Sequence, residues 1–442
     1  MHALARNIDA SELIARTGRV VAVRGQIVES IGPAAQVGER CRIGAVGSRA
    51  AIEAEVVGLN RGVTVLMPLG SIEGIGLGER VMALGSMPDV PVGGQLLGRV
   101  VDAFGQPVDH HGPLSAQRRR SLRAQPLRAM HRQRVDQPLE TGVKVIDSML
   151  TLAKGQRVGL FAGSGIGKSS LMGMMARGTQ AGVNVIALIG ERSREVREFI
   201  EDQLGQEGLQ RSVVVVATAD EPAVMRSKAA YAATTIAEYF RDQGEDVLLM
   251  MDSLTRFAMA RREIGLAVGE PPTARGYTPS VFSELPQLCE RAGPGTIAGS
   301  ITGVYTVLVD GDDMNEPVSD TLRATLDGHI VLSREIANGG QYPAVDVLQS
   351  VSRLHAAVGK PEDLAAARKL LAICSLYERN RQLVEIGVYK PGVSAPLDRA
   401  VQLMPRIRAF FGQGLGVKVA RTESLSELSK LAASLGGDHE FQ

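Results

Sequence analysis

The chain has 442 residues, 44% of them hydrophobic, which is enough to bury the cores of two or three globular domains. Its 49 Lys and Arg residues are balanced by 48 Asp and Glu residues, so the overall charge does not indicate nucleic acid or an anionic membrane as the main partner. Cys41, Cys289 and Cys374 lie too far apart for a zinc site or a disulfide framework, and the sequence has neither a signal-peptide core nor a run of about 18 apolar residues, so we expect a cytoplasmic protein with buried thiols.

The N-terminal part predicts a short terminal segment followed by an all-β unit. Within residues 1–18, Leu4, Ile8 and Leu13 have roughly the spacing of one helical face, which fits a short amphipathic helix, although a frayed terminus fits equally well. Residues 19–88 contain short Val- and Ile-rich runs separated by glycines, which is typical of a small β-barrel. This stretch has no aromatic residue, which counts against a barrel that binds nucleic acid by stacking.

A segment rich in Gly and Pro, Asp89–His111, then leads into a new domain. It is followed at 118–134 by RRRSLRAQPLRAMHRQR, where basic residues crowd together. A solvated surface segment explains such a stretch. Contact with an anionic membrane or with the acidic face of a partner is the alternative, and the sequence leaves both open.

Near-continuous apolar runs alternate with helical stretches from about Thr151 onward, as parallel strands buried on both faces require. The expected strands are RVGLFAG, NVIALIG, VVVVAT, VLLMMD, TVLVDG and HIVLS. The fold class is therefore α/β with a parallel sheet. After Pro361 the chain becomes helical, and SLSELSKLAASL forms a last helix. The residues expected on one side of the first of these helices are Leu364, Ala367, Leu371 and Cys374.

The sequence AGSGIGKSS at 162–170 lies directly after an expected strand and before an apolar helical stretch. Its glycines let the backbone turn tightly and direct N–H groups inward, so that the loop wraps phosphate oxygens at a helix N-terminus. Lys168 would reach the β- and γ-phosphates of ATP, and the Ser169 hydroxyl would bind Mg²⁺. Ala162 replaces the usual first glycine, which the loop tolerates at a strand end with negative φ. The expected nucleotide contacts are Gly163, Ser164, Gly165, Ile166, Gly167, Lys168, Ser169 and Ser170.

Two carboxylates follow other expected strands of the same sheet. DVLLMMD ends in Asp252, and a carboxylate at the C-terminal end of a parallel strand is placed to hold Mg²⁺ through water beside a phosphate loop. NVIALIGER puts Glu191 and Arg192 just past another strand, where a carboxylate orients and polarises the water that attacks the γ-phosphate. For Glu191, capping of the following helix is the alternative.

A series of long motifs occurs in a fixed order along the chain. They are VPVGGQLLGRVVDAFGQPVD, PLETGVKVID, AGSGIGKSS, GERSREVREF, LLMMDSLTRFAMARREIGLAVGEPPTARGYTPSVFSELPQLCERAG, TVLVDGDDMNEPVSD and LDGHIVLSREIANGGQYPAVDVLQSVSR. In these motifs the chain closely resembles the F-type/V-type rotary ATPase catalytic-subunit superfamily, and within it the type III secretion ATPases, above all the flagellar export ATPases. The resemblance implies a β-barrel domain at 19–88, a RecA-like P-loop domain at 89–360 and a C-terminal helical domain at 361–442. It also implies a homohexameric ring with active sites between neighbouring subunits.

The resemblance also implies site roles, position by position. Lys168, Glu191 and Arg192 would be catalytic, with Glu191 matching the catalytic glutamate of the GER motif, and Asp252 matches the carboxylate that supports Mg²⁺. Arg353, in SVSR, matches the arginine that such enzymes insert into the next subunit's site, where a guanidinium neutralises charge developing on the γ-phosphoryl group. A surface salt bridge is the alternative for this arginine.

For the adenine ring, Tyr342 in GQYPAVD matches the aromatic residue that packs against the base, with a core tyrosine as the alternative. The relatives carry a further adenine contact near the sequence written here as FFGQGLG. The chain departs from their pattern there, so neither Phe411 nor Leu415 is assigned.

Three classes of function fit a RecA-like ring. The resemblance favours an ATPase of protein export, because a single chain carries both Glu191 and Arg353 and a homohexamer is then self-sufficient. A nucleic-acid translocase would need an RNA-binding barrel, and a non-catalytic nucleotide-binding subunit would lack the glutamate or the loop lysine. A virulence injectisome ATPase shares the fold and the chemistry, and LVEIGVYKPGVSAPLDRAVQLMPRIRAFFGQ favours the flagellar assignment.

The resemblance implies ATP or ADP and Mg²⁺ as ligands. The implied partners are further copies of the chain, a stator-like regulator at the N-terminal region, a coiled-coil stalk protein in the ring pore, export chaperones with their cargo and the membrane export gate, with no specific nucleic acid. The implied location is cytoplasmic, at the cytoplasmic face of the inner-membrane export apparatus. Because residues 1–18 are few, a weaker or differently placed regulator contact is expected.

Overall fold

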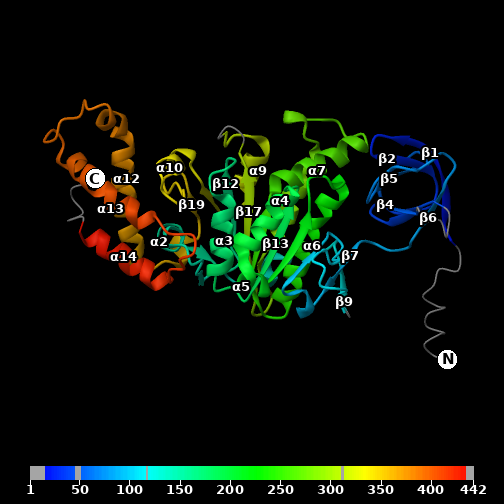
Figure 1. Ribbon diagram of the computed structural model, residues 1–442, viewed down its shortest axis with the longest axis horizontal. Coiled ribbons are helices and arrows are strands. Elements are labelled where there is room, and N and C mark those ends of the chain that lie inside the picture. The colour runs from blue at the N-terminus through cyan, green and yellow to red at the C-terminus, as the bar shows by residue number, and fades with distance from the viewer. Residues whose placement is uncertain (1–14, 45–50, 116–117, 310–312, 435–442) are drawn as a thin grey trace.

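The computed structural model describes residues 15–44, 51–115, 118–309 and 313–434. They form three parts along the long axis of the molecule, with a small β-barrel at one end, an α/β unit in the middle and a group of helices at the other end (Figure 1). This arrangement confirms the predicted fold class, while the domain boundaries remain predictions. The expected N-terminal helix lies outside the described residues. In the described part of the chain, no helix has the length and apolar character needed to cross a membrane.

The barrel is closed by six antiparallel strands in the order β1-β2-β5-β4-β3-β6. Val20, Val28, Leu66 and Val81 are buried inside it, as the alternation along short strands predicts. An ion pair between Glu55 of the barrel and a lysine of the central unit, with a distance of 2.8 Å, is one of the contacts that fix the barrel to its neighbour. The strands are β1 Thr17–Arg24, β2 Ile27–Ile31, β3 Arg40–Ile43, β4 Ile52–Asn60, β5 Val63–Pro68 and β6 Arg80–Ala83.

The central unit is built on a nine-stranded sheet in the order β19-β18-β12-β17-β15-β13-β14-β8, with β16 beside β17. Its strand pairs are parallel except for those of β16 and β19. All residues of β13 and β14 are buried, because helices cover both faces of the sheet. The strands are β8 Arg99–Val101, β12 Arg157–Ala162, β13 Val183–Ile189, β14 Ser212–Ala217, β15 Asp246–Asp252, β16 Gly293–Pro294, β17 Ser300–Leu308, β18 Gly328–Val331 and β19 Val351–Ser352.

Every expected strand of the sheet is present, but one starts earlier than its apolar run. β17 begins at Ser300, six residues before TVLVDG, because its first polar side chains are buried and hydrogen-bonded within the fold. The Ser300 hydroxyl, for example, donates to Asp246 at 2.7 Å. Such a strand start has no periodic apolar signal in the sequence.

Helices pack on the two faces of the sheet and form two separate cores. One face carries α3 and the C-terminal helices, and the opposite face carries α6 to α9. The helical elements of the central unit are α2 Lys144–Met149, α3 Lys168–Gly178, α4 Ser193–Glu198, the π-helical η3 Phe199–Leu204, α5 Gly205–Gln210, α6 Ala223–Asp242, α7 Leu254–Ala267, α8 Pro279–Glu290, α9 Pro317–Thr325, α10 Arg334–Asn338 and α11 His355–Val358.

Three helices form the C-terminal unit, α12 Pro361–Glu385, α13 Ala395–Phe411 and α14 Arg421–Ala433. α12 begins with a proline, which suits the first turn because the missing N–H would have no partner there. The prediction of its buried side is partly wrong, since Leu364 and Leu371 are only partly buried. The buried positions are Asp363, Ala366, Ala367, Leu370, Ile373 and Cys374. As predicted, the three cysteines are free and buried.

The basic stretch 118–134 lies on the central unit, where Arg118–Ser121 forms β9 and pairs with β7 (Asp89–Val92). Several of its arginines contact the protein itself. Arg120 forms an ion pair with Asp242 at 2.8 Å, for example. The short strands β10 (Pro138–Leu139) and β11 (Leu152–Ala153) follow it and pair with each other.

Candidate active site

The loop between β12 and α3 has the geometry of a phosphate-binding loop. Ala162 is the last, buried residue of β12, and Gly165 and Gly167 have positive φ values of 78° and 92° that other residues rarely adopt. Gly167 is the N-cap of α3, so the first N–H groups of that helix open toward the loop. Ile166 is buried in the hydrophobic core and anchors the loop there. The loop thus has the tight glycine turns that the sequence predicts, while its contacts with nucleotide remain a prediction.

Three predicted side chains meet at the C-terminal edge of the sheet. The ammonium of Lys168 contacts the carboxylate of Asp252 directly and lies 3.6 Å from Oε1 of Glu191. They come together because β12, β15 and β13 are close neighbours in a parallel sheet, so that their carboxyl ends share one edge. Asp252 also accepts a hydrogen bond of 2.7 Å from the hydroxyl of Thr306 on β17.

Burial and charge shift the pKa values of this cluster. Burial, together with repulsion from Asp252, raises the pKa of Glu191 to about 7, although Lys168 acts in the opposite direction. Burial by itself lowers the pKa of Lys168, but the two carboxylates outweigh it, so that the lysine pKa is raised. The lysine therefore stays charged, while the glutamate is poised to accept a proton near neutral pH.

The oxygen atoms of the cluster suit a magnesium ion. Ser169, Glu191 and Asp252 line one cavity of about 120 Å³ beside the phosphate loop. Oxygen donors from one or two carboxylates, completed by water and phosphate, are the ligands that Mg²⁺ prefers in nucleotide sites. Oε1 of Glu191 is buried without a hydrogen-bond partner, so this cavity has an acceptor that a bound water can use.

Tyr342 lies next to the phosphate loop, and its contact with adenine remains a prediction. Its ring is 3.5 Å from the point where a side chain on Gly167 would begin, and the residue is 44% exposed, so it is not a core tyrosine. Its carbonyl accepts a hydrogen bond of 2.9 Å from the backbone of Gln413. Of the two residues that the sequence left unassigned nearby, Phe411 is buried, whereas Leu415 is 48% exposed and is the more accessible to a ligand.

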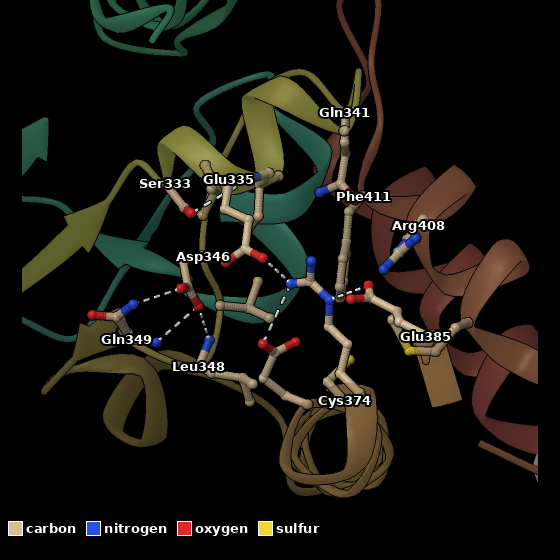
Figure 2. A pocket seen from close by; sticks show the side chains of 17 residues that line it. Ser333, Glu335, Gln341, Asp346, Leu348, Gln349, Cys374, Glu385, Arg408 and Phe411 are labelled. Atoms are coloured by element: carbon tan, nitrogen blue, oxygen red, sulfur yellow. Dashed lines mark hydrogen bonds and ion pairs between the residues drawn. The ribbon is translucent and has the colours of Figure 1, made fainter. Parts of the chain in front are cut away.

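A larger cavity of about 460 Å³ lies between the central unit and the C-terminal helices (Figure 2). Phe411 and Arg408 line it from the helical side, and Glu335 and Asp346 line it from the central unit. Arg381 of α12 bridges the two units through its contact with Glu335. This cavity is separate from the one lined by the phosphate loop, and it contains none of the predicted catalytic residues.

Two residues predicted to be catalytic, Arg192 and Arg353, lie outside the cluster of Lys168, Glu191 and Asp252. The Arg192 side chain is 83% exposed and pairs with Glu195 at 3.6 Å, so it does not point into the cavity of Glu191, and its catalytic role remains a prediction. Arg353 is exposed and follows β19, which pairs with the start of β18 at Gly328. The phosphate loop follows the opposite, C-terminal end of β12.

Sequence reasoning missed three residues that support the loop and the cluster. Thr306 binds Asp252, Arg334 of α10 donates to the carbonyl of Ser164 at 3.2 Å, and Arg256 of α7 packs against Gly190, directly before the predicted catalytic glutamate. All three residues belong to the long motifs quoted above, Thr306 to TVLVDGDDMNEPVSD, Arg334 to LDGHIVLSREIANGGQYPAVDVLQSVSR and Arg256 to the motif that begins LLMMDSLTRF. Local sequence gives no sign of the contact that each of them makes, because each contact joins segments far apart in the chain.

Comparisons with known proteins agree with this geometry. Residues 142–352 match the ATP synthase alpha/beta family, nucleotide-binding domain, and residues 360–430 match the T3SS EscN ATPase C-terminal domain. The chain is 51% identical to the Flagellum-specific ATP synthase of Bacillus subtilis (strain 168), over 97% of this chain and 98% of that protein. It is 50% identical to the Type 3 secretion system ATPase of Xanthomonas euvesicatoria, over 90% of each chain.

A solved structure extends the similarity to the whole fold. The assembled ATPase EscN from the type III secretion system of enteropathogenic E. coli has a TM-score of 0.89 and 42% sequence identity, and the match covers 94% of this chain and 100% of that chain. EscN was also solved in complex with its central stalk EscO. The chain therefore belongs to the type III secretion ATPases of the ATP synthase alpha/beta family and is a P-loop ATPase.

Proposed function

We propose that this chain hydrolyses Mg-ATP as a homohexameric ring and so energises protein export through a flagellar type III secretion apparatus. The observation that carries the proposal is the meeting of Lys168, Asp252 and Glu191 beside a loop of phosphate-binding geometry. Each of the three residue types has a distinct task in phosphoryl transfer to water. The three residues stand at or just after the ends of three separate strands, β12, β15 and β13, at one edge of the sheet.

The roles follow from position. Lys168 and the loop N–H groups hold the phosphate oxygens, with Ser169 and, through water, Asp252 as the Mg²⁺ partners. Bound Mg²⁺ would neutralise charge on the β- and γ-phosphates. Glu191 orients the attacking water and accepts its proton, a task for which a pKa of about 7 suits it at neutral pH. Tyr342 packs on adenine with its exposed ring.

Arg353 serves the site of a neighbouring subunit in this proposal. Arg353 follows Ser352, the partner of Gly328, and lies at the level of Asp327, two residues before His329, the partner of Gly159 on β12. About six residues of strand separate this level from Gly163, which is roughly 20 Å along a parallel sheet. Arg353 is thus too far from the phosphate loop of its own subunit to serve it. The assembled state of the related EscN supports insertion of the arginine into the site of the next subunit.

The flagellar assignment, the partners and the location are part of the same proposal. The flagellum-specific relative of Bacillus subtilis is matched over 97% of this chain, which supports a flagellar system. The partners are a coiled-coil stalk protein, a stator-like regulator, chaperones with their cargo and the export gate. The complex of EscN with its central stalk EscO supports the stalk. The ring would work at the cytoplasmic face of the inner membrane.

A mixing experiment tests the shared site. Steady-state Mg-ATP hydrolysis is measured against protein concentration for the wild type, Glu191→Gln, Arg353→Ala and an equimolar mixture of the two variants. We expect the specific activity to rise with concentration, both variants to be inactive alone, and the mixture to regain part of the activity. Activity that is independent of concentration, or an Arg353→Ala variant with the full rate, would show that each chain carries a complete site.

An injectisome ATPase is the second candidate, because the Xanthomonas type III secretion ATPase is 50% identical over 90% of this chain. Deletion of the gene in its own organism separates the two. Loss of filaments and swimming supports the flagellar function. Normal swimming with loss of effector secretion supports the injectisome.

A further inference from the structure

Arg353 is held in place by very little secondary structure. The strand before it, β19, has only two residues and lies at the edge of the sheet, where it pairs on one side only. A Cβ on Gly328 would come within 2.4 Å of the Val351 carbonyl, so the two strands approach closely here. Two such residues do not fix the position of a long, exposed side chain, and other contacts have to do so.

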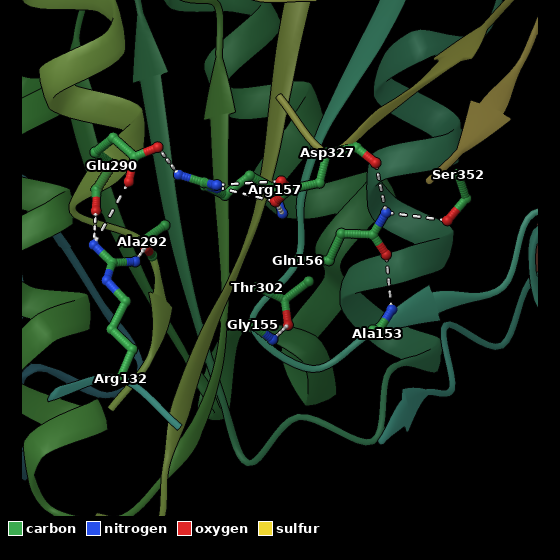
Figure 3. Close-up of polar contacts among 10 residues, drawn as sticks. All are labelled: Arg132, Ala153, Gly155, Gln156, Arg157, Glu290, Ala292, Thr302, Asp327 and Ser352. Carbon is green, nitrogen blue, oxygen red and sulfur yellow. Dashed lines mark hydrogen bonds and ion pairs between the residues drawn. The ribbon is translucent and has the colours of Figure 1, made fainter. Parts of the chain in front are cut away.

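A buried amide from another strand connection supplies these contacts. Gln156, in the turn between β11 and β12, is completely buried, and its Nε2 donates to Oγ of Ser352 at 3.0 Å and to the carbonyl of Asp327 at 3.2 Å (Figure 3). Its Oε1 accepts from the backbone of Ala153 at 2.9 Å. Ser352 in turn donates to the carbonyl of Thr151 at 3.1 Å. The amide therefore reaches past β18 and ties β19 to the start of β12.

Asp327 connects the amide to Arg353. Its carbonyl accepts both from Gln156 and from the backbone N–H of Arg353, the latter at 3.0 Å. Its carboxylate receives the guanidinium of Arg157 through two hydrogen bonds of 3.0 and 3.1 Å (Figure 3). The guanidinium of Arg353 also donates to the carbonyl of Arg323 at 3.1 Å. The backbone at Arg353 is thus held by its own N–H, which binds Asp327, and by the side chain of the preceding Ser352, which binds Gln156.

We propose that Gln156 is a positioning residue for Arg353, acting through Ser352 and Asp327. The inference rests on the proposed role of Arg353 in the site of a neighbouring subunit. Gln156 touches neither nucleotide nor the reacting atoms of either site. Loss of its amide leaves the nucleotide site of its own subunit intact and displaces the arginine offered to the next one. A misplacement of about 1 Å costs roughly 100-fold in rate in enzymes that depend on exact positioning.

The chain offers a matched control for the cost of losing a buried amide. Asn184 is also fully buried, and its Nδ2 donates to a carbonyl, that of Ala176, and to a serine hydroxyl, that of Ser212. Asn184 belongs to β13 and has no connection to β19. Asn184→Leu and Gln156→Leu both remove a hydrogen bond donated to a carbonyl and one donated to a serine hydroxyl. Gln156→Leu also removes the bond accepted from Ala153, and only Gln156 is connected to Arg353.

The test combines kinetics with subunit mixing in the full-length chain. We expect Gln156→Leu to lower kcat about 10- to 100-fold with an unchanged KM for ATP. Mixing with Glu191→Gln, which brings an intact Arg353 to the variant's intact site, should restore activity. Mixing with Arg353→Ala should not, because neither chain then presents the arginine correctly. Ser352→Ala, a milder change that keeps the fold if Gln156→Leu does not, should show the same pattern with a loss of roughly fivefold, equivalent to one neutral hydrogen bond.

The outcomes separate this inference from the function on which it rests. Rescue by Glu191→Gln but not by Arg353→Ala, together with no such selectivity for Asn184→Leu, supports the positioning role. Rescue by both variants, by neither, or a raised KM would show that Gln156 acts on stability or on its own site, and would overturn the inference. If the mixture of Glu191→Gln and Arg353→Ala itself regained no activity, the proposed function would be wrong and the inference would fall with it.

Discussion

Lys168 and Asp252, 84 positions apart in the sequence, are in direct contact through the lysine ammonium and the aspartate carboxylate. Both side chains are almost completely buried. The lysine is the first residue of α3, and the aspartate is the last residue of β15. The contact joins the phosphate loop to β15, which is separated from β12 by β17 in the sheet. It makes the stability of the apoprotein depend on the residues that bind nucleotide.

The Lys168→Met variant should both lose nucleotide binding and destabilise the fold. Removal of the ammonium leaves the carboxylates of Asp252 and Glu191 buried without a cation, and breaking a buried pair costs about 3 to 5 kcal/mol. Thermal unfolding and binding of a fluorescent ATP analogue measure the two effects. Lys154→Met is the control, because its pair with Asp246 is partly exposed and its loss costs at most about 1 kcal/mol. Equal losses of stability in the two variants would contradict the prediction.

Glu191→Gln should bind ATP but lower kcat by at least about 100-fold, because an amide cannot accept the proton of the attacking water.

The pKa of Glu191 also predicts opposite effects of pH on activity and stability. The fold raises it from 4.5 to about 7, so the neutral form is favoured and its contribution to stability is lost as pH rises through about 7. Wild-type apoprotein should therefore lose stability relative to Glu191→Gln between about pH 4.5 and 7, while hydrolysis increases. Parallel stability curves for the two proteins would show that this carboxyl has an ordinary pKa.

Ser169 and Ser170 provide a matched pair of variants that tests whether the Ser169 hydroxyl binds Mg²⁺. Both stand in the first turn of α3, but only Ser169 lines the cavity of Glu191 and Asp252. Ser169→Ala should raise the Mg²⁺ concentration required for half-maximal hydrolysis roughly tenfold, while ATP binding in EDTA stays unchanged. Ser170→Ala should leave the Mg²⁺ titration close to that of the wild type. A shift of the same size in both variants would argue against Ser169 as a metal ligand.

Tyr342→Ala should weaken ATP binding without destabilising the protein. The ring is exposed and lies beside Gly167, so its loss removes stacking worth about 0.5 to 1.5 kcal/mol, or roughly a three- to tenfold change in KM. Tyr342→Phe should retain the wild-type KM, because the ring face and not the hydroxyl makes the contact. If Tyr342→Ala lowered the unfolding temperature by several degrees at an unchanged KM, the residue would be part of the core after all.

Much of this protein can be predicted from local sequence. The strands β12 to β15 are continuous apolar runs, and the loop that follows β12 has Gly165 and Gly167 at positions that adopt positive φ. In the barrel, β1, β2 and β3 alternate more and less buried residues with period two, whereas most residues of β5 are buried. These signals are local, because backbone conformation and amphipathic spacing depend on residues close together in the chain.

The sequence by itself thus determined the element types, the phosphate loop and, through the long motifs, the family. The tertiary structure alone decided that Lys168, Glu191 and Asp252 meet, that Arg353 stands at the other end of the sheet and that Gln156 supports it. These relations depend on the order in which strands pair, and β12 reaches β15 only through β17, which comes later in the chain. Local periodicity does not encode that order, because strand pairing is fixed by packing between segments far apart in sequence.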